Sequence, residues 1–202
     1  MRSSQDAINL IINEETGGQK YYEAAEIHPD WPGGASGVTI GIGYDCGYST
    51  SDQIFGDWGG HLDDKSVVAL SHIAGIHGSP AQALAHELHW ISVPWAEAMS
   101  VFMQHDVPKW EAIVQSHLPN TDLLSGDSFG ALLSLTFNRG SSFDNPLPRY
   151  SEMRNIKLYM GTKEFAKIPG EFLSMRRLWP QGGDLWRRRG HEADLFTRGL
   201  TA

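Results

Sequence analysis

The sequence predicts an α+β fold in which one helix leads into a small β lobe, followed by a larger lobe made of helices. Residues 3–15 begin with two candidate serine caps and carry isoleucines at helical spacing, which predicts a helix that ends near Glu15. Residues 19–48 are rich in glycine, aromatic and β-branched residues, which predicts a small, irregular β-hairpin. Because no repeat or low-complexity linker interrupts the chain, we expect residues 1–202 to form a single domain with a ligand cleft between its lobes.

The expected strand covers residues 38–44, where glycines stand among β-branched residues and leave room for another backbone or a ligand. Residues 16–18, Thr-Gly-Gly, predict the end of the first helix. The later helices are expected at 64–75, 80–89, 94–105, 107–117, 127–138, 150–158, 162–168, 170–178 and 184–197. Residues 127–138 are apolar nearly all round, which predicts that this helix is the buried, central one.

Charge and composition exclude several classes of protein. A formal net charge of −8 argues against a nucleic-acid partner. The chain has no apolar run of about 18 residues, so we expect no membrane insertion. The N-terminal segment lacks the apolar core and cleavage site of a secretory signal, and the single cysteine, Cys46, cannot form an internal disulfide. We therefore expect synthesis in the cytoplasm, with delivery by other machinery if the target lies outside it.

Three residues around the expected strand have the chemistry to cleave a glycosidic bond. Glu15 ends an apolar helix, where burial would raise the pKa of its carboxyl group so that it retains a proton. Asp45 follows the strand and supplies a second carboxylate, and Thr39 in the strand offers a hydroxyl that can hold a water molecule. Such cleavage requires a proton donor on one side of the bond and a group on the other that activates water or stabilises positive charge.

Several segments resemble motifs of the phage-type lysozymes, and more closely those of the pesticin-like muramidases. Residues 10–15 resemble the family's opening helix, with Tyr22 at the family's distance after the catalytic glutamate. Residues 36–45 resemble its Thr-Ile-Gly-x-Gly strand and the aspartate that follows it. The family's later helices are resembled by residues 91–106, 129–140 and 185–196. Each motif alone is weak, but the ordered set covers nearly the whole chain.

The resemblance implies a lysozyme-like fold and cleavage of the β-1,4 bond between N-acetylmuramic acid and N-acetylglucosamine in peptidoglycan. It implies that Glu15 is the general acid and that Asp45 and Thr39 position and activate the attacking water, with inversion at the anomeric carbon. The candidate substrate-binding residues are Tyr44, Trp31, Asn138 and Arg139. Such an enzyme would be an antibacterial effector toxin or a phage endolysin that acts on the cell wall in the periplasm.

The expected partner is peptidoglycan, joined by a cognate immunity protein if the chain is an effector, and we expect a monomer. We expect no metal and no cofactor. His86 and His89 are separated by three positions, which is not the His-Glu-x-x-His spacing of zinc proteases. Residues 187–189 are consecutive arginines, for which we expect a solvated helix face with ion pairs. Most tryptophans are expected in the core, whereas Trp31 stands in a loop and suits stacking on a sugar.

Alternatives remain for several of these residues. Glu14 rivals Glu15 as the acid. Asp30 rivals Asp45, because many phage members carry the catalytic aspartate in the loop before the threonine, and that loop is longer here. Packing would equally explain Tyr44, and a helix end before Gly140 would equally explain Asn138 and Arg139. The alternative function is a peptidoglycan-binding module of the same fold without catalytic activity.

Overall fold

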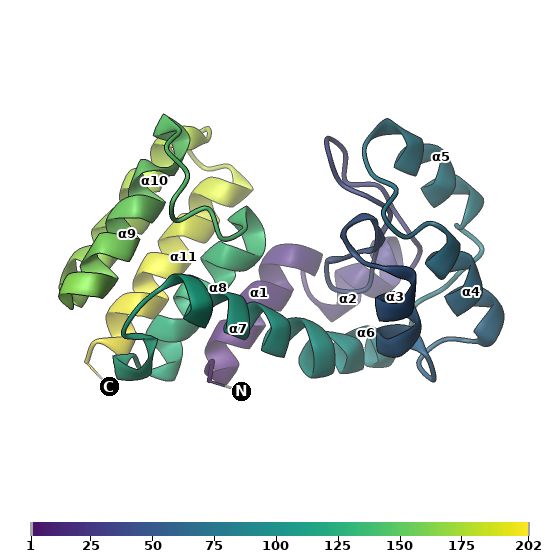
Figure 1. Cartoon of the computed structure of the whole chain (residues 1–202), viewed down its shortest axis with the longest axis horizontal. Coiled ribbons are helices and arrows are strands. Elements are labelled where there is room, and N and C mark those ends of the chain that lie inside the picture. Colours follow the sequence, from purple (N-terminus) through teal and green to yellow (C-terminus); the bar gives the residue numbers. More distant parts are fainter. Residues whose placement is uncertain (1, 202) are drawn as a thin grey trace. The chain divides into compact units, whose positions relative to one another are not determined.

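A computed structural model describes residues 2–201, which form two compact units. Unit 1 runs up to Glu14 and resumes at Pro108, and unit 2 runs from Glu15 to Val107. Helices dominate both units (Figure 1), and unit 2 also holds a small two-stranded antiparallel sheet. The described chain is therefore mostly helical with one small sheet, in agreement with the predicted α+β class.

Both units are assembled from elements of moderate length. The elements of unit 2 are the last turn of α1 (Gln5–Thr16), α2 (Gln19–Tyr21), the π-helical η1 (Tyr22–Glu26), β1 (Thr39–Ile40), β2 (Tyr44–Asp45), the 3-10 turn η2 (Cys46–Tyr48), α3 (Ser51–Trp58), α4 (Asp64–His72), α5 (Ser79–Glu87), α6 (Trp95–Val101) and the π-helical η3 (Phe102–Asp106). The elements of unit 1 are the rest of α1, α7 (Val107–His117), α8 (Gly126–Arg139), α9 (Ser151–Thr162), α10 (Ile168–Met175), α11 (Asp184–Gly199) and the 3-10 turns η4 (Thr121–Leu123), η5 (Pro148–Tyr150), η6 (Phe165–Lys167) and η7 (Arg176–Leu178).

The first helix ends where the sequence predicts. Ile8 and Ile11 of α1 are fully buried, and Gly17 and Gly18 follow the helix with φ of 63° and 91°. Glycine adopts such positive φ values without the steric penalty that a Cβ atom imposes, which is why the helix stops here.

The segment predicted as one strand is a hairpin, so that prediction is wrong in detail. Thr39 pairs with Asp45, and Ile40 pairs with Tyr44. Residues 41–43 make the turn, with φ of 58° at the first glycine and 75° at the second. The glycines thus turn the chain back on itself within the segment, and they shorten each strand to two residues.

Two helical segments were not predicted. Residues 19–26, expected to be irregular or β, form α2 and η1, which are anchored by buried Tyr22 through a hydrogen bond from its hydroxyl to the carbonyl of Val93 at 2.8 Å. Residues 51–58 form α3, which begins with a capping box between Thr50 and Gln53. Such a box satisfies two backbone N–H groups that a helix start otherwise leaves without partners.

The central helix of unit 1 is α8, as predicted. Phe129, Leu132 and Leu135 are fully buried in it, and α8 packs on α11, which in turn contacts α10 (Figure 1). Gly130 of α8 lies so close to α1 that a Cβ atom at this position would stand 2.0 Å from the Cβ of Ala7. Glycine is therefore required here by close helix packing rather than by backbone conformation.

The prediction of a solvated arginine face on α11 is wrong for two of its three residues. Arg187 is exposed and pairs with Asp184, but Arg188 and Arg189 are buried. Oε1 of the fully buried Glu192 lies 2.8 Å from Nη2 of Arg189 and 3.4 Å from Nε of Arg188. A carboxylate one helical turn away makes burial of these guanidinium groups tolerable, because a buried charge needs a partner.

The tryptophans are less buried than predicted. Trp90 is 48% exposed, and the other tryptophans expected in the core are only partly buried, namely Trp95, Trp110, Trp179 and Trp186. Trp58, at the end of α3, is the fully buried one, and it packs edge-on against Tyr44 with ring centroids 5.5 Å apart. Cys46 is also buried in unit 2 and is a free thiol. None of the described helices is long and apolar enough to cross a lipid bilayer.

Candidate functional site

An acidic pocket of about 260 Å³ lies within unit 2 beside the hairpin. Its polar side chains come from the end of α1, from η1 and the loop after it, and from β1. They are Glu15, Glu26, His28, Asp30 and Thr39. The turn of the hairpin completes the lining, so that backbone and a set of three carboxyl groups surround one small cavity.

The hairpin and the preceding loop are tied together at the pocket. The N–H of Asp30 donates to the carbonyl of Thr39 at 3.0 Å, and the N–H of Thr39 donates to the carbonyl of Asp30 at 2.8 Å. Two reciprocal backbone bonds fix the position of both residues relative to one another. As a result, the loop carboxylate and the strand hydroxyl are held at the same pocket by backbone rather than by flexible side-chain contacts.

Glu26 is affected by the other two carboxyl groups of the pocket. Burial raises the pKa of Glu26, and the nearby negative charges of Asp30 and Glu15 raise it further. Each of these effects disfavours an additional negative charge in the pocket. The pocket therefore favours retention of a proton, which is what a general acid needs near neutral pH.

A hydrogen bond sets which ring nitrogen of His28 carries a hydrogen at the edge of the pocket. Its Nδ1 lies 2.8 Å from the carbonyl oxygen of Ile91, and because a carbonyl only accepts hydrogen bonds, this nitrogen carries the hydrogen. In the neutral ring Nε2 is then an acceptor. The ring also packs on that of His89, with centroids 4.3 Å apart.

Asp45, predicted as the second catalytic carboxylate, is not among the residues that line the acidic pocket. Its side chain accepts hydrogen bonds from the N–H of Gly37 at 3.0 and 3.1 Å and from the N–H of Gly47 at 2.8 Å. Burial raises the pKa of Asp45, whereas these bonds act in the opposite direction. A Cβ atom on Gly37 would stand 2.4 Å from the backbone nitrogen of Gly47, so the backbone segments at these two glycines approach closely around the carboxylate.

The neighbouring glutamates at the end of α1 have different surroundings. Oε1 of Glu14 lies 2.7 Å from Nδ1 of His191, and both residues belong to unit 1. Glu15 instead lines the acidic pocket of unit 2. Consecutive residues of a helix point about 100° apart, which is why one of the two glutamates reaches the pocket and the other does not.

Tyr44 packs against Trp58 and does not line the acidic pocket. It is 4% exposed, its ring contacts Trp58, and its hydroxyl donates to Oδ2 of Asp57 at 2.9 Å. Asp57 is also 2.9 Å from Nδ1 of His105, so the hydroxyl belongs to a small polar network next to the core. Of the two interpretations of Tyr44, this geometry favours the packing one.

Asn138 and Arg139 lie at the end of α8 in unit 1, where they line a polar pocket of about 270 Å³. Oδ1 of Asn138 accepts a hydrogen bond from Arg189 at 3.3 Å. The guanidinium of Arg139 donates to the carbonyl of Arg149 at 2.8 Å and lies 5.2 Å from the ring centroid of Trp179. They do not line the acidic pocket, and their role in substrate binding stays a prediction.

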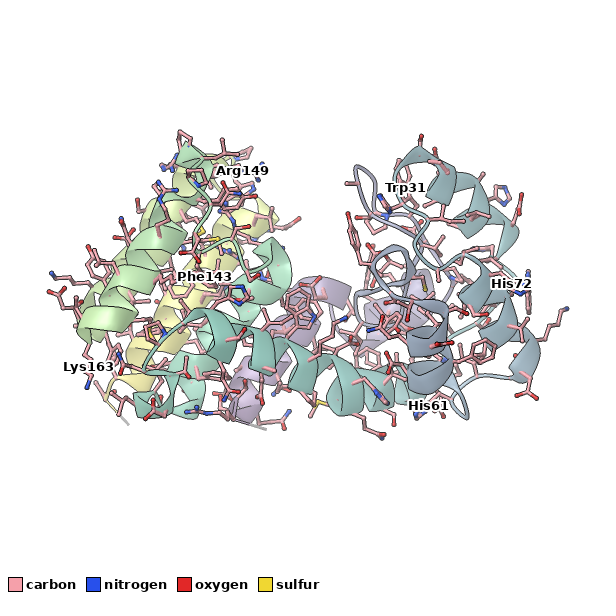
Figure 2. The ribbon with its side chains drawn as sticks, in the orientation of Figure 1. Trp31, His61, His72, Phe143, Arg149 and Lys163 are labelled. Atoms are coloured by element: carbon pink, nitrogen blue, oxygen red, sulfur yellow. The ribbon has the colours of Figure 1, made fainter. Side chains whose placement is uncertain are left out.

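Trp31 lines a different pocket of unit 2, of about 430 Å³, which we call the tryptophan pocket. Its lining residues come from the loop in which Figure 2 labels Trp31, and from α5 and the turn that follows it. The polar or aromatic residues that line it are Asp30, Trp31, Gln82, His86 and His89. The indole Nε1–H donates to the carbonyl of Ser36 at 2.9 Å, which fixes the ring within its own loop.

Sequence reasoning overlooked Glu26 and His28. Glu26 ends the short helix η1, which was not predicted, and His28 lies two residues beyond it; neither belongs to a recognisable motif. The signal that was available is the concentration of ionisable residues in the long loop that also contains Asp30. Only the fold shows that this loop returns to the hairpin.

The sequence matches no known protein-family model, and comparison with curated proteins yields no significant relative. Among residues 2–201, no cluster of three or more His, Cys, Asp or Glu side chains is arranged to hold a metal ion. The acidic pocket is consequently the strongest basis for assigning a function.

Proposed function

We propose that this protein is a glycoside hydrolase that cleaves the β-1,4 bond between N-acetylmuramic acid and N-acetylglucosamine in peptidoglycan. The observation that carries the proposal is the acidic pocket, which places Glu15, Glu26 and Asp30 around one cavity together with the hydroxyl of Thr39. Glycosidic bonds are cleaved in most such enzymes by a pair of carboxyl groups, one protonated and one ionised. The choice of peptidoglycan as the substrate comes from the resemblance of the sequence motifs to the lysozymes.

Glu15 is the proposed general acid. It stands on the last turn of a well-packed helix, which is a more rigid support than a loop, and it shares its pocket with two further carboxyl groups. Its position at the pocket, together with the resemblance of residues 10–15 to the family's opening helix, supports Glu15 as the acid. In the reaction, Glu15 donates a proton to the leaving oxygen of the glycosidic bond.

Two aspartates are candidates for the opposite side of the bond. Asp30 lines the pocket and is joined to Thr39 by two backbone hydrogen bonds, which supports a shared role in holding the attacking water. Asp45 was predicted for this role, but its acceptance of hydrogen bonds from Gly37 and Gly47 favours a role in holding the loop. We therefore propose Asp30 as the base, with Thr39 as its partner and Asp45 as a support of the hairpin.

The proposal is tested by comparing two neighbouring substitutions, Glu15→Gln and Glu14→Gln. Purified protein is incubated with peptidoglycan and the soluble muropeptides are analysed for reducing-end N-acetylmuramic acid. Loss of a general acid lowers the rate by about 10²–10⁴-fold, and we expect this for Glu15→Gln. Glu14→Gln, which removes only a carboxylate beside exposed His191, should retain nearly full activity.

The test has outcomes that would overturn the proposal. Equal activity of Glu15→Gln and the unmodified protein would exclude Glu15 as the acid. Binding to cell walls without any released muropeptide would favour the alternative of a non-catalytic binding module. Products with 1,6-anhydro ends would indicate a transglycosylase instead of a hydrolase.

A further inference from the structure

The tryptophan pocket adjoins the acidic pocket, although the catalytic proposal makes no use of it. Asp30 lines both pockets. In addition, His28 of the acidic pocket packs on His89 of the tryptophan pocket, with ring centroids 4.3 Å apart. One shared carboxylate and one contacting pair of imidazole rings thus connect the two cavities.

Hydrogen bonds and regular structure hold the backbone around the tryptophan pocket. On the loop side, the hydrogen bond from the indole of Trp31 to Ser36 and the backbone bonds between Asp30 and Thr39 restrict movement. On the other side, Gln82 and His86 are carried by α5, which begins with a proline in its first turn. Because the Trp31 ring is already held by its hydrogen bond, it loses little conformational entropy when a ligand binds.

The chemistry of the lining suits a neutral sugar. An indole offers a flat apolar surface, and amide, imidazole and carboxylate groups can exchange hydrogen bonds with hydroxyl and acetamido groups. None of the described residues that line the tryptophan pocket is Lys or Arg, and Asp30 contributes negative charge. An anionic ligand, such as the carboxylates of a peptide stem, would therefore meet repulsion without a permanent positive charge to balance it.

We propose that the tryptophan pocket binds an N-acetylhexosamine unit of the same glycan strand whose bond is cleaved at the acidic pocket. The inference rests on the proposed function, because it assumes that the strand also occupies the acidic pocket. Asp30 stands at the junction and contacts sugar units on either side. The protein then has one extended saccharide groove within unit 2, and its affinity rises when a glycan is long enough to fill both cavities.

Binding is measured without turnover, so that it is independent of the catalytic assignment. The Glu15→Gln protein is titrated calorimetrically with N-acetylglucosamine oligomers of two to six units, and the titration is repeated after adding Trp31→Ala. We expect affinity to rise with oligomer length and Trp31→Ala to weaken binding of the longest oligomer by about tenfold, as loss of an aromatic contact does. The shortest oligomer should bind both proteins equally.

Matched variants separate the pocket from a general effect on folding. Trp90→Ala removes an exposed tryptophan of unit 2 that lies outside both pockets, and it should leave binding unchanged. Gln82 lies on the exposed side of α5, where alanine favours the helix. Gln82→Ala should therefore weaken binding of the longest oligomer without altering thermal unfolding.

Failure of this inference is distinguishable from failure of the proposed function. If Trp31→Ala and Gln82→Ala bind the longest oligomer as tightly as their parent, the accessory sugar site is refuted even when Glu15 proves catalytic. Binding of a free stem peptide that both substitutions abolish would also refute it, because it would assign the pocket to peptide. Length-dependent binding that needs Trp31, in a protein that releases no muropeptide, would support the site and contradict only the catalytic assignment.

Discussion

The two units place their charged groups in opposite settings. In unit 1, Glu192 and two arginines are buried together, and Oε1 of Glu192 also accepts a hydrogen bond from Ser134 at 2.7 Å. In unit 2, three carboxyl groups gather at a solvent-accessible pocket, where burial and mutual repulsion raise the pKa of Glu26. The first arrangement neutralises charge inside a core, whereas the second concentrates charge of one sign at a surface.

The difference separates stability from chemistry. A buried ionic cluster is strongly destabilised when one partner is removed, because a charge is then left in the core without compensation. A cluster of like charges at a pocket destabilises the fold slightly, and its presence is better explained by a reaction or a ligand. Substitutions in the buried cluster of unit 1 should consequently change the free energy of unfolding, whereas substitutions in the acidic pocket should change activity.

The largest effect on stability is expected from Glu192→Gln. This substitution keeps the shape of the side chain but leaves Arg188 and Arg189 in the core without their carboxylate, so the free energy of unfolding should fall by about 3–5 kcal/mol. Urea denaturation measures this change. The control is Asp6→Asn, which breaks an exposed pair with Arg198 and should change stability by less than about 1 kcal/mol. Similar losses in both variants would contradict the comparison.

A smaller effect is expected from the two aspartates of unit 2, and it differs in kind. Asp45→Ala leaves the N–H groups of Gly37 and Gly47 without their acceptor and should reduce stability by about 1–3 kcal/mol. Asp30→Ala should reduce muropeptide release while leaving the unfolding midpoint nearly unchanged, because Asp30 is exposed and its loop is held by backbone bonds. The reverse pattern would restore Asp45 as the catalytic carboxylate.

The smallest effect is expected from Glu26→Gln, and it depends on pH. Since the pKa of Glu26 is raised in the folded protein, ionisation destabilises the native state above that pKa, and the penalty vanishes below the unfolded pKa of about 4.3. The substitution should therefore gain stability relative to the unmodified protein as the pH rises from about 4 to about 7. Solvent screening at a partly exposed group keeps the gain below about 0.5 kcal/mol. A difference that does not vary with pH would indicate that Glu26 titrates normally.

The helices that carry strong local signals were predictable from sequence. The burial of α8 follows from apolar residues on all of its sides, and the end of α1 follows from consecutive glycines. The start of α3 was also readable, because Thr50 and Gln53 form a capping box ahead of buried Ile54 and Trp58, yet this segment was overlooked. A small hairpin was predicted within residues 19–48, but its strands and turn were not located, because two-residue strands have too little alternation to be recognised.

The candidate site was predictable only in part, because it depends on contacts between distant segments. Glu15 and Thr39 were selected from motifs, and both line the acidic pocket. The return of the loop to the hairpin through the backbone of Asp30 leaves no signature in the spacing of residues. Burial of Arg188 was likewise hidden, since a run of arginines has the same composition on a surface as in a core.

Burial of the one cysteine has a practical consequence for the study of unit 2. Cys46 has no exposed surface, and burial, followed by the charge of Asp45, raises the pKa of its thiol. The thiol of Cys46 therefore reacts as a thiolate only after the surrounding structure opens. The rate at which a disulfide reagent labels the native protein thus reports how often unit 2 opens around Cys46, and no engineered cysteine is needed.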